Sequence, residues 1–382
     1  MKKREFLQLC ACGAMGALTH KPVPAGLRAE LNALASSHPV DDELWKWSKE
    51  ALFVEQTPDG VHCLKCPNSC TIPAGGTGLC RNRVNVRGKL YSIAYGNPCA
   101  VHVDPIEKKP LFHFLPSTRA FSIAAAGCNL SCLNCQNWQI SQVSPKETDN
   151  EDLMPRAVVD SARRSGSASI AYTYSEPTTF YEYAYDTAEI ARREGIRNVW
   201  KSNGYIEEAP LRKLCRVIDA ANIDLKSFDE GIYGRLNAGS LAPVLRTLRI
   251  FHDMGVWLEI TNLVIPGWTD DLAMIGKMCA WLCSNGLDTA PLHFSRFVPL
   301  YKLNQLPPTP VKKLEEAHAV ALKEGMKYVY IGNVPGHSAE HTYCHHCKKL
   351  IVERRGYAIL QNRMKKSCCE FCGEPIPGRW QM

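Results

Sequence analysis

Three cysteines stand close together in the stretch AAGCNLSCLNCQNWQIS, residues 125–141. They are Cys128, Cys132 and Cys135, with three residues and then two residues between them. Thiolates are soft ligands that suit zinc, copper(I) and iron–sulfur clusters. A structural zinc site needs four protein ligands, and this stretch has no fourth cysteine and no histidine. Three thiolates on a four-iron cluster leave one iron without a protein ligand, whereas ferredoxins close that position with a fourth thiolate. The spacing therefore indicates an iron–sulfur cluster with one open iron.

A second group of cysteines lies upstream and has four members. Cys63, Cys66, Cys70 and Cys80 form the pattern C-x2-C-x3-C-x9-C, with the flexible stretch PAGGTG before the last of them. Four thiolates are enough for a closed zinc site or for an auxiliary iron–sulfur cluster. We favour a structural metal that staples a loop-rich segment, and an electron relay is the alternative.

A third group lies near the C-terminus and consists of two Cys-x2-Cys pairs. The pairs are Cys344 with Cys347 and Cys369 with Cys372, separated by residues 348–368. This spacing is close to that of a zinc ribbon, so we expect a zinc-ribbon-like module. Cys368 is then spare or replaces Cys369, and His345 and His346 are possible substitute ligands. The basic segment between the pairs is interpreted as a solvated face rather than a nucleic-acid patch.

The composition agrees with a large globular protein. The chain has 382 residues, of which 45% are hydrophobic and 22% charged, and this length suggests two or three structural units. The net charge of +7 is too small over this length to indicate nucleic-acid binding by itself. Most of the 18 cysteines fall in the three groups, which is typical of metal sites rather than disulfides. We therefore expect a reducing compartment and a cytoplasmic protein.

The N-terminus complicates that expectation. Residues 1–40 begin with MKKREFLQL, where Lys3 and Arg4 precede Phe6 and Leu7. This resembles a degenerate twin-arginine signal, which would export the folded protein, and the alternative is a short amphipathic helix. The sequence has no apolar run of roughly 18 residues, so we expect no membrane-spanning helix.

From about residue 119, short apolar runs alternate with helical stretches that mostly end at glycine. The predicted strands are 120–126, 167–174, 197–203, 220–226, 256–265, 291–298 and 327–333. The predicted helices are 153–166, 178–195, 209–220, 241–255, 271–286 and 309–325. Such alternation predicts an α/β fold with a parallel sheet, either a partial or full (β/α) barrel or a doubly wound sheet. In a barrel, chemistry takes place at the C-terminal ends of the strands, and the three-cysteine stretch follows the first strand.

The domain organisation follows from these patterns. We predict a leader over residues 1–40, an N-terminal four-cysteine module over 41–118, a core barrel over 119–340 and a C-terminal Cys-knuckle module over 341–382.

The C-x3-C-x2-C loop after the first strand of an α/β barrel resembles the radical S-adenosylmethionine (SAM) superfamily. Further stretches carry the same resemblance: YTYSEPT stands where the family has a Gly-Gly-Glu turn, WKSNGY resembles its TNG strand end, and DLK and NLVIPGWTDD resemble motifs of the activases. The resemblance implies a [4Fe-4S] cluster whose open iron chelates the amino and carboxylate groups of SAM. One electron then cleaves SAM to a 5′-deoxyadenosyl radical that abstracts hydrogen from a substrate.

The resemblance also implies roles for individual residues. It makes Cys128, Cys132 and Cys135 the catalytic cluster ligands, and it assigns cofactor binding to Ser175, Glu176, Ser202, Asn203, Asp224 and Lys226. Lys226 has an alternative role as the ion-pair partner of Asp224 or Asp229. Two positions depart from the family pattern. Asn134 replaces the usual aromatic residue before the last cysteine, and Tyr301 stands where activases often have a histidine.

The flanking sequences narrow the resemblance further. CLKCPNSCTIPAGGTGLCRNRVN, then YGNPCAVHVDPIEKKPLFHFLP, then the cysteine loop resemble in this order the radical SAM enzyme of the AmmeMemoRadiSam system. That group is akin to pyruvate formate-lyase activating enzyme. The resemblance implies Memo-like and AMMECR-like partner proteins and an electron donor such as flavodoxin or ferredoxin.

Two functions from different classes follow. The first is a radical SAM enzyme whose expected substrates include a partner protein, as in the activases. The second is a non-catalytic metal-binding module that recognises nucleic acid or protein, and it predicts tetrahedral zinc in all three cysteine groups.

Overall fold

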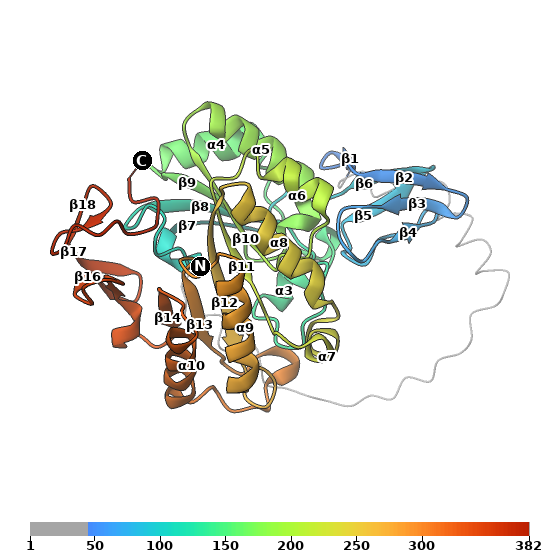
Figure 1. The fold of residues 1–382 in the computed structure, drawn as a ribbon. Coiled ribbons are helices and arrows are strands. Elements are labelled where there is room, and N and C mark those ends of the chain that lie inside the picture. Colours follow the sequence, from blue (N-terminus) through green and yellow to red (C-terminus); the bar gives the residue numbers. More distant parts are fainter. Residues whose placement is uncertain (1–44, 382) are drawn as a thin grey trace, which may run out of the picture. The chain divides into compact units, whose positions relative to one another are not determined.

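The structure, a computed structural model, describes residues 45–381 (Figure 1). The predicted leader over residues 1–40 lies outside these residues. The described residues lie within one compact unit that spans 42–382.

A curved eight-stranded sheet forms the centre of the described part of the chain, in the order β14-β13-β12-β11-β10-β9-β8-β7. Strands β8 to β14 are parallel neighbours in sequence order, and β7 pairs antiparallel with β8. The strands are β7 (Ala100–Pro105), β8 (Arg119–Ala124), β9 (Ser169–Tyr172), β10 (Arg197–Ser202), β11 (Ala220–Asp224), β12 (Trp257–Val264), β13 (Leu292–Arg296) and β14 (Val329–Gly332). This order is that of a partial (β/α) barrel with β7 and β14 at its two edges, not of a doubly wound sheet, whose order reverses at a switch point.

Helices connect successive parallel strands and lie along the outer face of the sheet (Figure 1). They are α3 (Trp138–Ser141), α4 (Pro155–Arg164), α5 (Tyr181–Arg193), α6 (Glu208–Leu214), α7 (Glu230–Ile232), α8 (Leu241–Asp253), α9 (Leu272–Ser284) and α10 (Val311–Lys323). Shorter helical turns are η1 (Ile106–Lys108), η2 (Pro145–Glu147), η3 (Pro177–Phe180), the π-helical η4 (Tyr233–Asn237), η5 (Tyr301–Leu303) and η6 (Ser338–Glu340). Their apolar sides and the sheet share one large core, in which Trp200, Phe251 and Phe294 are fully buried.

All seven predicted strands and six predicted helices are present. The edge strand β7 was not predicted, because its residues AVHVDP are half exposed and end in proline, so they lack an apolar run. The central sheet therefore begins before residue 119, although the domain boundaries themselves stay predictions.

The N-terminal segment forms two small three-stranded sheets, β1-β6-β5 and β2-β3-β4. The strands are β1 (Lys49–Glu50), β2 (Val54–Thr57), β3 (Gly60–Cys63), β4 (Thr71–Ile72), β5 (Arg83–Val86) and β6 (Lys89–Ser92). Strands β5 and β6 form a hairpin, and its turn residues Arg87 and Gly88 have φ angles of 51° and 82°. Both values belong to the left-handed region that a tight hairpin turn requires. This segment is joined to the barrel through Glu182 of α5, which pairs with Lys65 and Arg83 at 2.6 Å and 2.7 Å.

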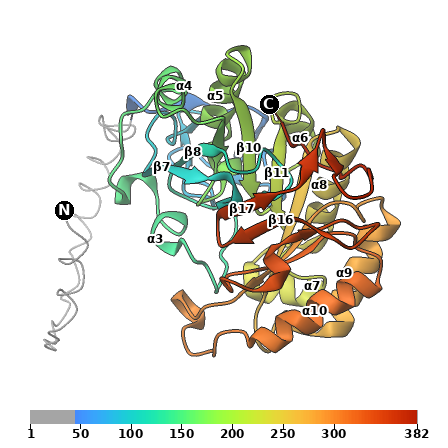
Figure 2. The same cartoon turned by 90° about the vertical axis from the view of Figure 1, so that its left-hand side faces the viewer.

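The C-terminal segment forms β15 (Thr342–Tyr343), β16 (Leu350–Arg355), β17 (Ala358–Asn362), β18 (Met364–Lys365) and β19 (Cys368–Cys369). Figure 2 shows the β16–β17 hairpin beside the sheet, where Ile351 and Val352 pack in one cluster with Tyr330 of β14. The predicted solvated face holds for most of β17, but Arg354 of β16 is 1% exposed. Its guanidinium donates to the carbonyl of Phe112 and to Thr342, so it belongs to the core.

None of the helices within residues 45–381 combines the length and the apolar character that crossing a membrane requires.

Candidate metal and cofactor sites

The loop that carries the three cysteines leaves β8 at the C-terminal edge of the sheet, as predicted. Cys132 is buried, and Cys128 and Cys135 are half-buried. The Cys128 sulfur accepts hydrogen bonds from the Leu130 amide at 3.4 Å and from Asn203 Nδ2 at 3.7 Å. Cys132 Sγ accepts from Asn237 Nδ2 at 3.2 Å. Donors of this kind stabilise sulfur that carries negative charge.

Asn237 had no signal in the sequence that linked it to the cysteines. It ends the π-helical turn η4, and the next residue, Ala238, has a φ angle of 56°. Two backbone bonds hold this turn against the cysteine loop, from Ser131 N to the Asn237 carbonyl and from Leu133 N to the Leu236 carbonyl. π-Helical turns often occur at functional sites, but the one-dimensional pattern of this segment does not distinguish them from α-helix.

Burial raises the pKa of the Cys128 thiol well above its usual range, and nearby Glu176 and Cys132 raise it further. Burial likewise raises the pKa of the Cys135 thiol. Buried thiols of this kind become thiolates when metal ions supply compensating positive charge. The donor set of three soft ligands with N–H groups directed at two of the sulfurs therefore fits a [4Fe-4S] cluster.

The predicted residues after the second and third strands meet next to this loop. The Ser175 hydroxyl donates to the Ala125 carbonyl. Glu176 accepts hydrogen bonds from Ser202 Oγ at 2.8 Å and from the Asn203 amide at 2.9 Å. Burial raises the pKa of Glu176, while these donors lower it. The carboxylate thus holds Ser202 and Asn203 in place beside the cysteines.

The DLK motif forms a charged group on the same edge. Asp224 lies between two lysines: it pairs with Lys201 and, at 3.0 Å, with Lys226. Burial by itself raises the pKa of Asp224, but the two ammonium groups hold it at about 2. Burial lowers the pKa of Lys226, but the Asp224 carboxylate raises it above its usual range, and a thiolate at nearby Cys132 raises it further. Lys201 carries no functional signal in the sequence, because it lies inside a predicted strand and not at a motif position.

An aromatic pair flanks the loop. The rings of Trp138 and Tyr301 stack with centroids 5.3 Å apart and an interplanar angle of 14°. Trp138 follows the last cysteine, and the amide of Lys302 donates to the Leu133 carbonyl in the loop. The site thus has aromatic rings close to the cysteines even though position 134 is asparagine.

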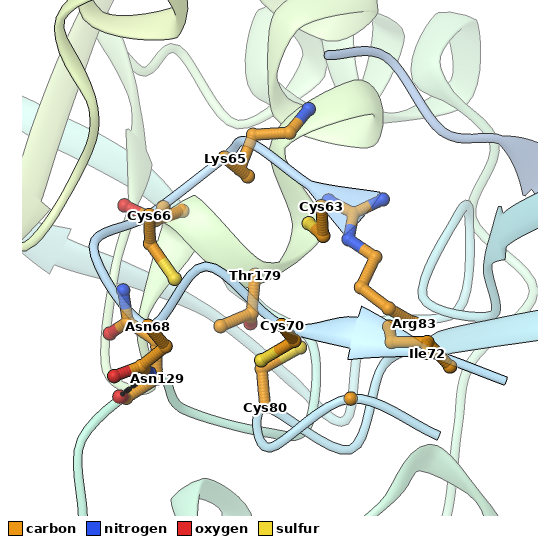
Figure 3. A pocket seen from close by; sticks show the side chains of 12 residues that line it. Cys63, Lys65, Cys66, Asn68, Cys70, Ile72, Cys80, Arg83, Asn129 and Thr179 are labelled. Atoms are coloured by element: carbon orange, nitrogen blue, oxygen red, sulfur yellow. Dashed lines mark hydrogen bonds between the residues drawn. The ribbon is translucent and has the colours of Figure 1, made fainter. Parts of the chain in front are cut away.

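The N-terminal quartet lines a pocket against the same loop. The sulfur atoms of Cys63, Cys66, Cys70 and Cys80 face a common space (Figure 3). Asn129, from the cysteine loop, also lines this space.

The C-terminal quartet is a compact cluster. The sulfur atoms of Cys344, Cys347, Cys369 and Cys372 all lie within 4.8 Å of one another. Cys344 and Cys372 are 3.7 Å apart, as are Cys347 and Cys369. Four thiolates around one tetrahedral zinc at about 2.3 Å are separated by about 3.8 Å. The zinc-ribbon-like module is thus confirmed in its geometry.

The choice among the possible C-terminal ligands is also resolved. Cys369, not Cys368, belongs to the cluster. Of the two histidines, His345 hydrogen-bonds Tyr328 at 2.7 Å and pairs with Glu374 at 3.1 Å. Neither histidine is in the cluster.

Fold and site together define a radical SAM protein, and comparison with known proteins agrees. Residues 122–278 match the radical SAM superfamily. The chain is 45% identical over 331 residues to uncharacterized protein MJ0808 of Methanocaldococcus jannaschii, a match that covers 86% of this chain and 98% of that protein. It is 27% identical over 151 residues to pyruvate formate-lyase 1-activating enzyme of Escherichia coli, covering 38% of this chain and 61% of that enzyme.

Two solved structures give weaker matches. A radical SAM methyltransferase from Sphaerobacter thermophilus matches 81% of each chain with 15% identity and a TM-score of 0.46. A domain of pyruvate-formate lyase-activating enzyme from Bacteroides vulgatus matches 43% of this chain and 99% of that domain, with 17% identity and a TM-score of 0.38.

The chain belongs to the radical SAM superfamily, and it shares a family with the Methanocaldococcus protein. It is an enzyme of this superfamily, whose members use a [4Fe-4S] cluster and SAM for radical chemistry.

Proposed function

We propose that Cys128, Cys132 and Cys135 hold the [4Fe-4S] cluster of this enzyme and that SAM occupies the iron they leave open. When bound, the cluster would supply the electron for reductive cleavage of SAM, and this cleavage would start hydrogen abstraction from a substrate. The observation that carries the proposal is the set of three thiols at the C-terminal end of the first parallel strand, with amide groups directed at the sulfurs of Cys128 and Cys132. Chemistry on (β/α) barrels is located at this edge.

The surrounding polar groups supply the contacts that a zwitterionic amino-acid group needs. Glu176 offers negative charge next to Ser175, Ser202 and Asn203, and Lys226 offers positive charge facing the loop. Asp224 holds Lys226 in position and keeps it charged. We therefore assign these six residues to SAM binding, with Glu176 on the side of the amino group and Lys226 on the side of the carboxylate.

We further propose an activase-like reaction on a macromolecular substrate. Exposed apolar side chains gather after β13, where Val298 and Leu300 precede Tyr301, and Trp138 is exposed beside them. Such side chains at the catalytic edge suit a protein partner better than a small polar metabolite. Memo-like and AMMECR-like proteins are the partners that the sequence resemblance suggests, and flavodoxin or ferredoxin is the electron donor. A reducing, cytoplasmic location stays a prediction.

The second function, a purely zinc-binding module, requires tetrahedral spacing in all three cysteine groups. Among the described residues, that spacing occurs in the C-terminal group alone, which favours the enzyme.

The test is reductive cleavage of SAM by anaerobically reconstituted protein, followed by measurement of 5′-deoxyadenosine. We expect the wild type and Cys99→Ala to produce it, because the Cys99 thiol donates to the Ala124 carbonyl and lies outside the three groups. Cys128→Ala should reduce it to background. Cleavage that survives Cys128→Ala would refute the assignment.

A further inference from the structure

We infer that Cys63, Cys66, Cys70 and Cys80 bind a second iron–sulfur cluster, not the structural zinc that their sequence pattern favours. The first reason is size. The four sulfur atoms of the C-terminal quartet lie within 4.8 Å of one another, close enough to hold one metal ion, and among the described residues the N-terminal quartet forms no such compact group. Thiolates on a single zinc must approach to about 3.8 Å. Thiolates of a four-iron cluster bind separate iron atoms and stand farther apart.

The second reason is the pocket between the sulfurs. Cys63 at the end of β3, Cys66 and Cys70 in the loop that follows, and Cys80 in the turn before β5 face it, and the barrel contributes Thr178 and Thr179 to its wall (Figure 3). A one-ion site needs no such space, because its ligands meet at the metal. The space between these thiols suits a group with several atoms.

The third reason is a buried cation in the wall with an unsatisfied donor. Arg83 lines the pocket and is 2% exposed. One of its guanidinium nitrogens, Nη1, lies 2.7 Å from Glu182. The other, Nη2, has no hydrogen-bond partner among the described residues. A buried donor of this kind calls for an acceptor, and a cluster with four thiolates carries the negative charge and sulfur acceptors that would satisfy it.

The pocket lies directly against the three-cysteine loop. Gly127, which precedes Cys128, has a φ angle of 100°, and a Cβ there would stand 2.4 Å from the Cys80 carbonyl oxygen. Asn82 Nδ2 donates to the Ala126 carbonyl at 2.6 Å. The Asn129 side chain contacts the thiols of both Cys66 and Cys128. One side chain therefore separates the two groups of sulfur ligands.

Because the two cysteine groups are adjacent, we assign electron transfer to the second cluster. The electron acceptor is the cluster of the three-cysteine loop, so this role rests on the proposed function. Four thiolates close every iron, so the second cluster binds no substrate and serves as an electron carrier. A low-potential one-electron donor protein, flavodoxin or ferredoxin, would reduce it by one electron. That electron then passes to the three-thiolate cluster, which is reduced as the carrier is reoxidised, with no proton or bond exchanged.

The metal content of anaerobically reconstituted wild-type protein tests the inference without any variant. Two four-iron clusters and one zinc give about eight irons, eight sulfides and one zinc per chain. About four irons and two zincs would overturn the inference and leave the proposed function standing.

Variants assign each cluster. We expect the triple variant Cys128→Ala/Cys132→Ala/Cys135→Ala to keep about four irons, with an electron paramagnetic resonance signal that SAM does not change. The quadruple variant Cys63→Ala/Cys66→Ala/Cys70→Ala/Cys80→Ala should keep a signal that SAM does change. An iron-free triple variant would overturn the inference. A triple variant that still cleaves SAM would instead overturn the proposed function.

The electron-carrier role has its own readout. In the quadruple variant, the ratio of SAM cleavage driven by flavodoxin to cleavage driven by dithionite should fall, because dithionite is small enough to reduce the remaining cluster directly. Cys99→Ala should keep the wild-type ratio. An unchanged ratio in the quadruple variant would refute the relay.

Discussion

The two cysteine quartets offer the same four ligands but build sites of different size. In the C-terminal quartet, each Cys-x2-Cys pair lies in a tight turn with a residue in the left-handed region, Lys348 at 62° and Gly373 at 76°. These turns bring pairs of sulfur atoms to 3.7 Å. In the N-terminal quartet, the ligands are spread over the end of β3, the loop that follows it and the turn before β5, and the barrel forms part of the wall. Site size therefore depends on the backbone around the cysteines more than on their number.

The two quartets also lie at opposite ends of the strands of the central sheet. The C-terminal module packs on Tyr328 and Tyr330, and its Trp380 contacts His113, which stacks over Trp257 at the start of β12. The N-terminal quartet faces the loop that leaves the end of β8. In (β/α) barrels, the face at the N-terminal ends of the strands contributes to stability, and the face at their C-terminal ends carries the chemistry. We therefore expect a metal in the C-terminal quartet to stabilise the fold and the cluster that we propose for the N-terminal quartet to serve the reaction.

The largest expected effect concerns the C-terminal cysteine quartet. Cys369→Ala should abolish zinc binding, and the C-terminal module should lose a metal-binding free energy on the order of 10 kcal/mol. Cys368→Ala is the matched control, because the Cys368 thiol lies outside the cluster although it is adjacent in sequence. Zinc analysis and thermal unfolding should show loss of zinc and a lower Tm for Cys369→Ala alone, with iron content unchanged. Equal zinc loss in both variants would contradict the ligand assignment.

The elements of the barrel could be predicted from sequence because their signals are local. Short apolar strand runs such as 120–126 are bounded by turn residues, and the helices carry helical periodicity and glycine stops. The cysteine loop was likewise placed correctly after the first strand. β7 was missed because an edge strand buries little, so its residues need no apolar pattern.

Contacts between distant segments were not predictable in this way. Asn237 reaches the Cys132 sulfur from a residue 105 positions away. Lys201 pairs with Asp224 only because β10 and β11 are neighbours in register. The metal preference of the N-terminal quartet also depends on such contacts, since spacing along the chain left both zinc and iron–sulfur chemically possible.

The second prediction concerns how the N-terminal module is attached. The C-terminal module packs through apolar and aromatic side chains, whereas the N-terminal one uses buried ion pairs of Glu182 with Lys65 and Arg83. Glu182→Gln should leave two buried cations without an anion and cost about 3–5 kcal/mol of unfolding free energy. Glu189→Gln is the control on the exposed side of the same helix. Denaturant unfolding measures both, and equal effects would contradict the role of the pairs.

The same ion pairs predict a pH dependence. Burial alone raises the pKa of Glu182, but Arg83 and Lys65 hold it at about 2. In the unfolded chain a glutamate has a pKa of about 4.3. The stabilisation is therefore complete above about pH 4.3 and is lost as the pH falls from there towards 2. Glu182→Gln should weaken this acid-dependent loss in unfolding measured across that range, and an identical profile would contradict it.

A smaller effect is expected where the two thiol-bearing segments touch. Gly127→Ala places a methyl group against the Cys80 carbonyl, whereas Gly88→Ala, at a φ angle of 82°, meets no atom within 4 Å. Both variants carry the cost of a positive φ, so their difference isolates the clash, which should be about 1–3 kcal/mol. We expect Gly127→Ala to lose iron at a normal zinc content. Equal iron and stability in the two variants would show that the segments do not need this close approach.

The smallest effect tests the polar link between the same segments. Asn68 Nδ2 donates to the Asn129 carbonyl at 2.6 Å, so Asn68→Ala removes one hydrogen bond worth about 1 kcal/mol. Asn304→Ala, at an exposed position after η5, is the control. Because the bond joins the N-terminal quartet to the three-cysteine loop, its loss should change the electron paramagnetic resonance signals of reduced protein and leave zinc unchanged. Signals identical to those of Asn304→Ala would mean that the two cysteine groups are adjacent without influencing each other.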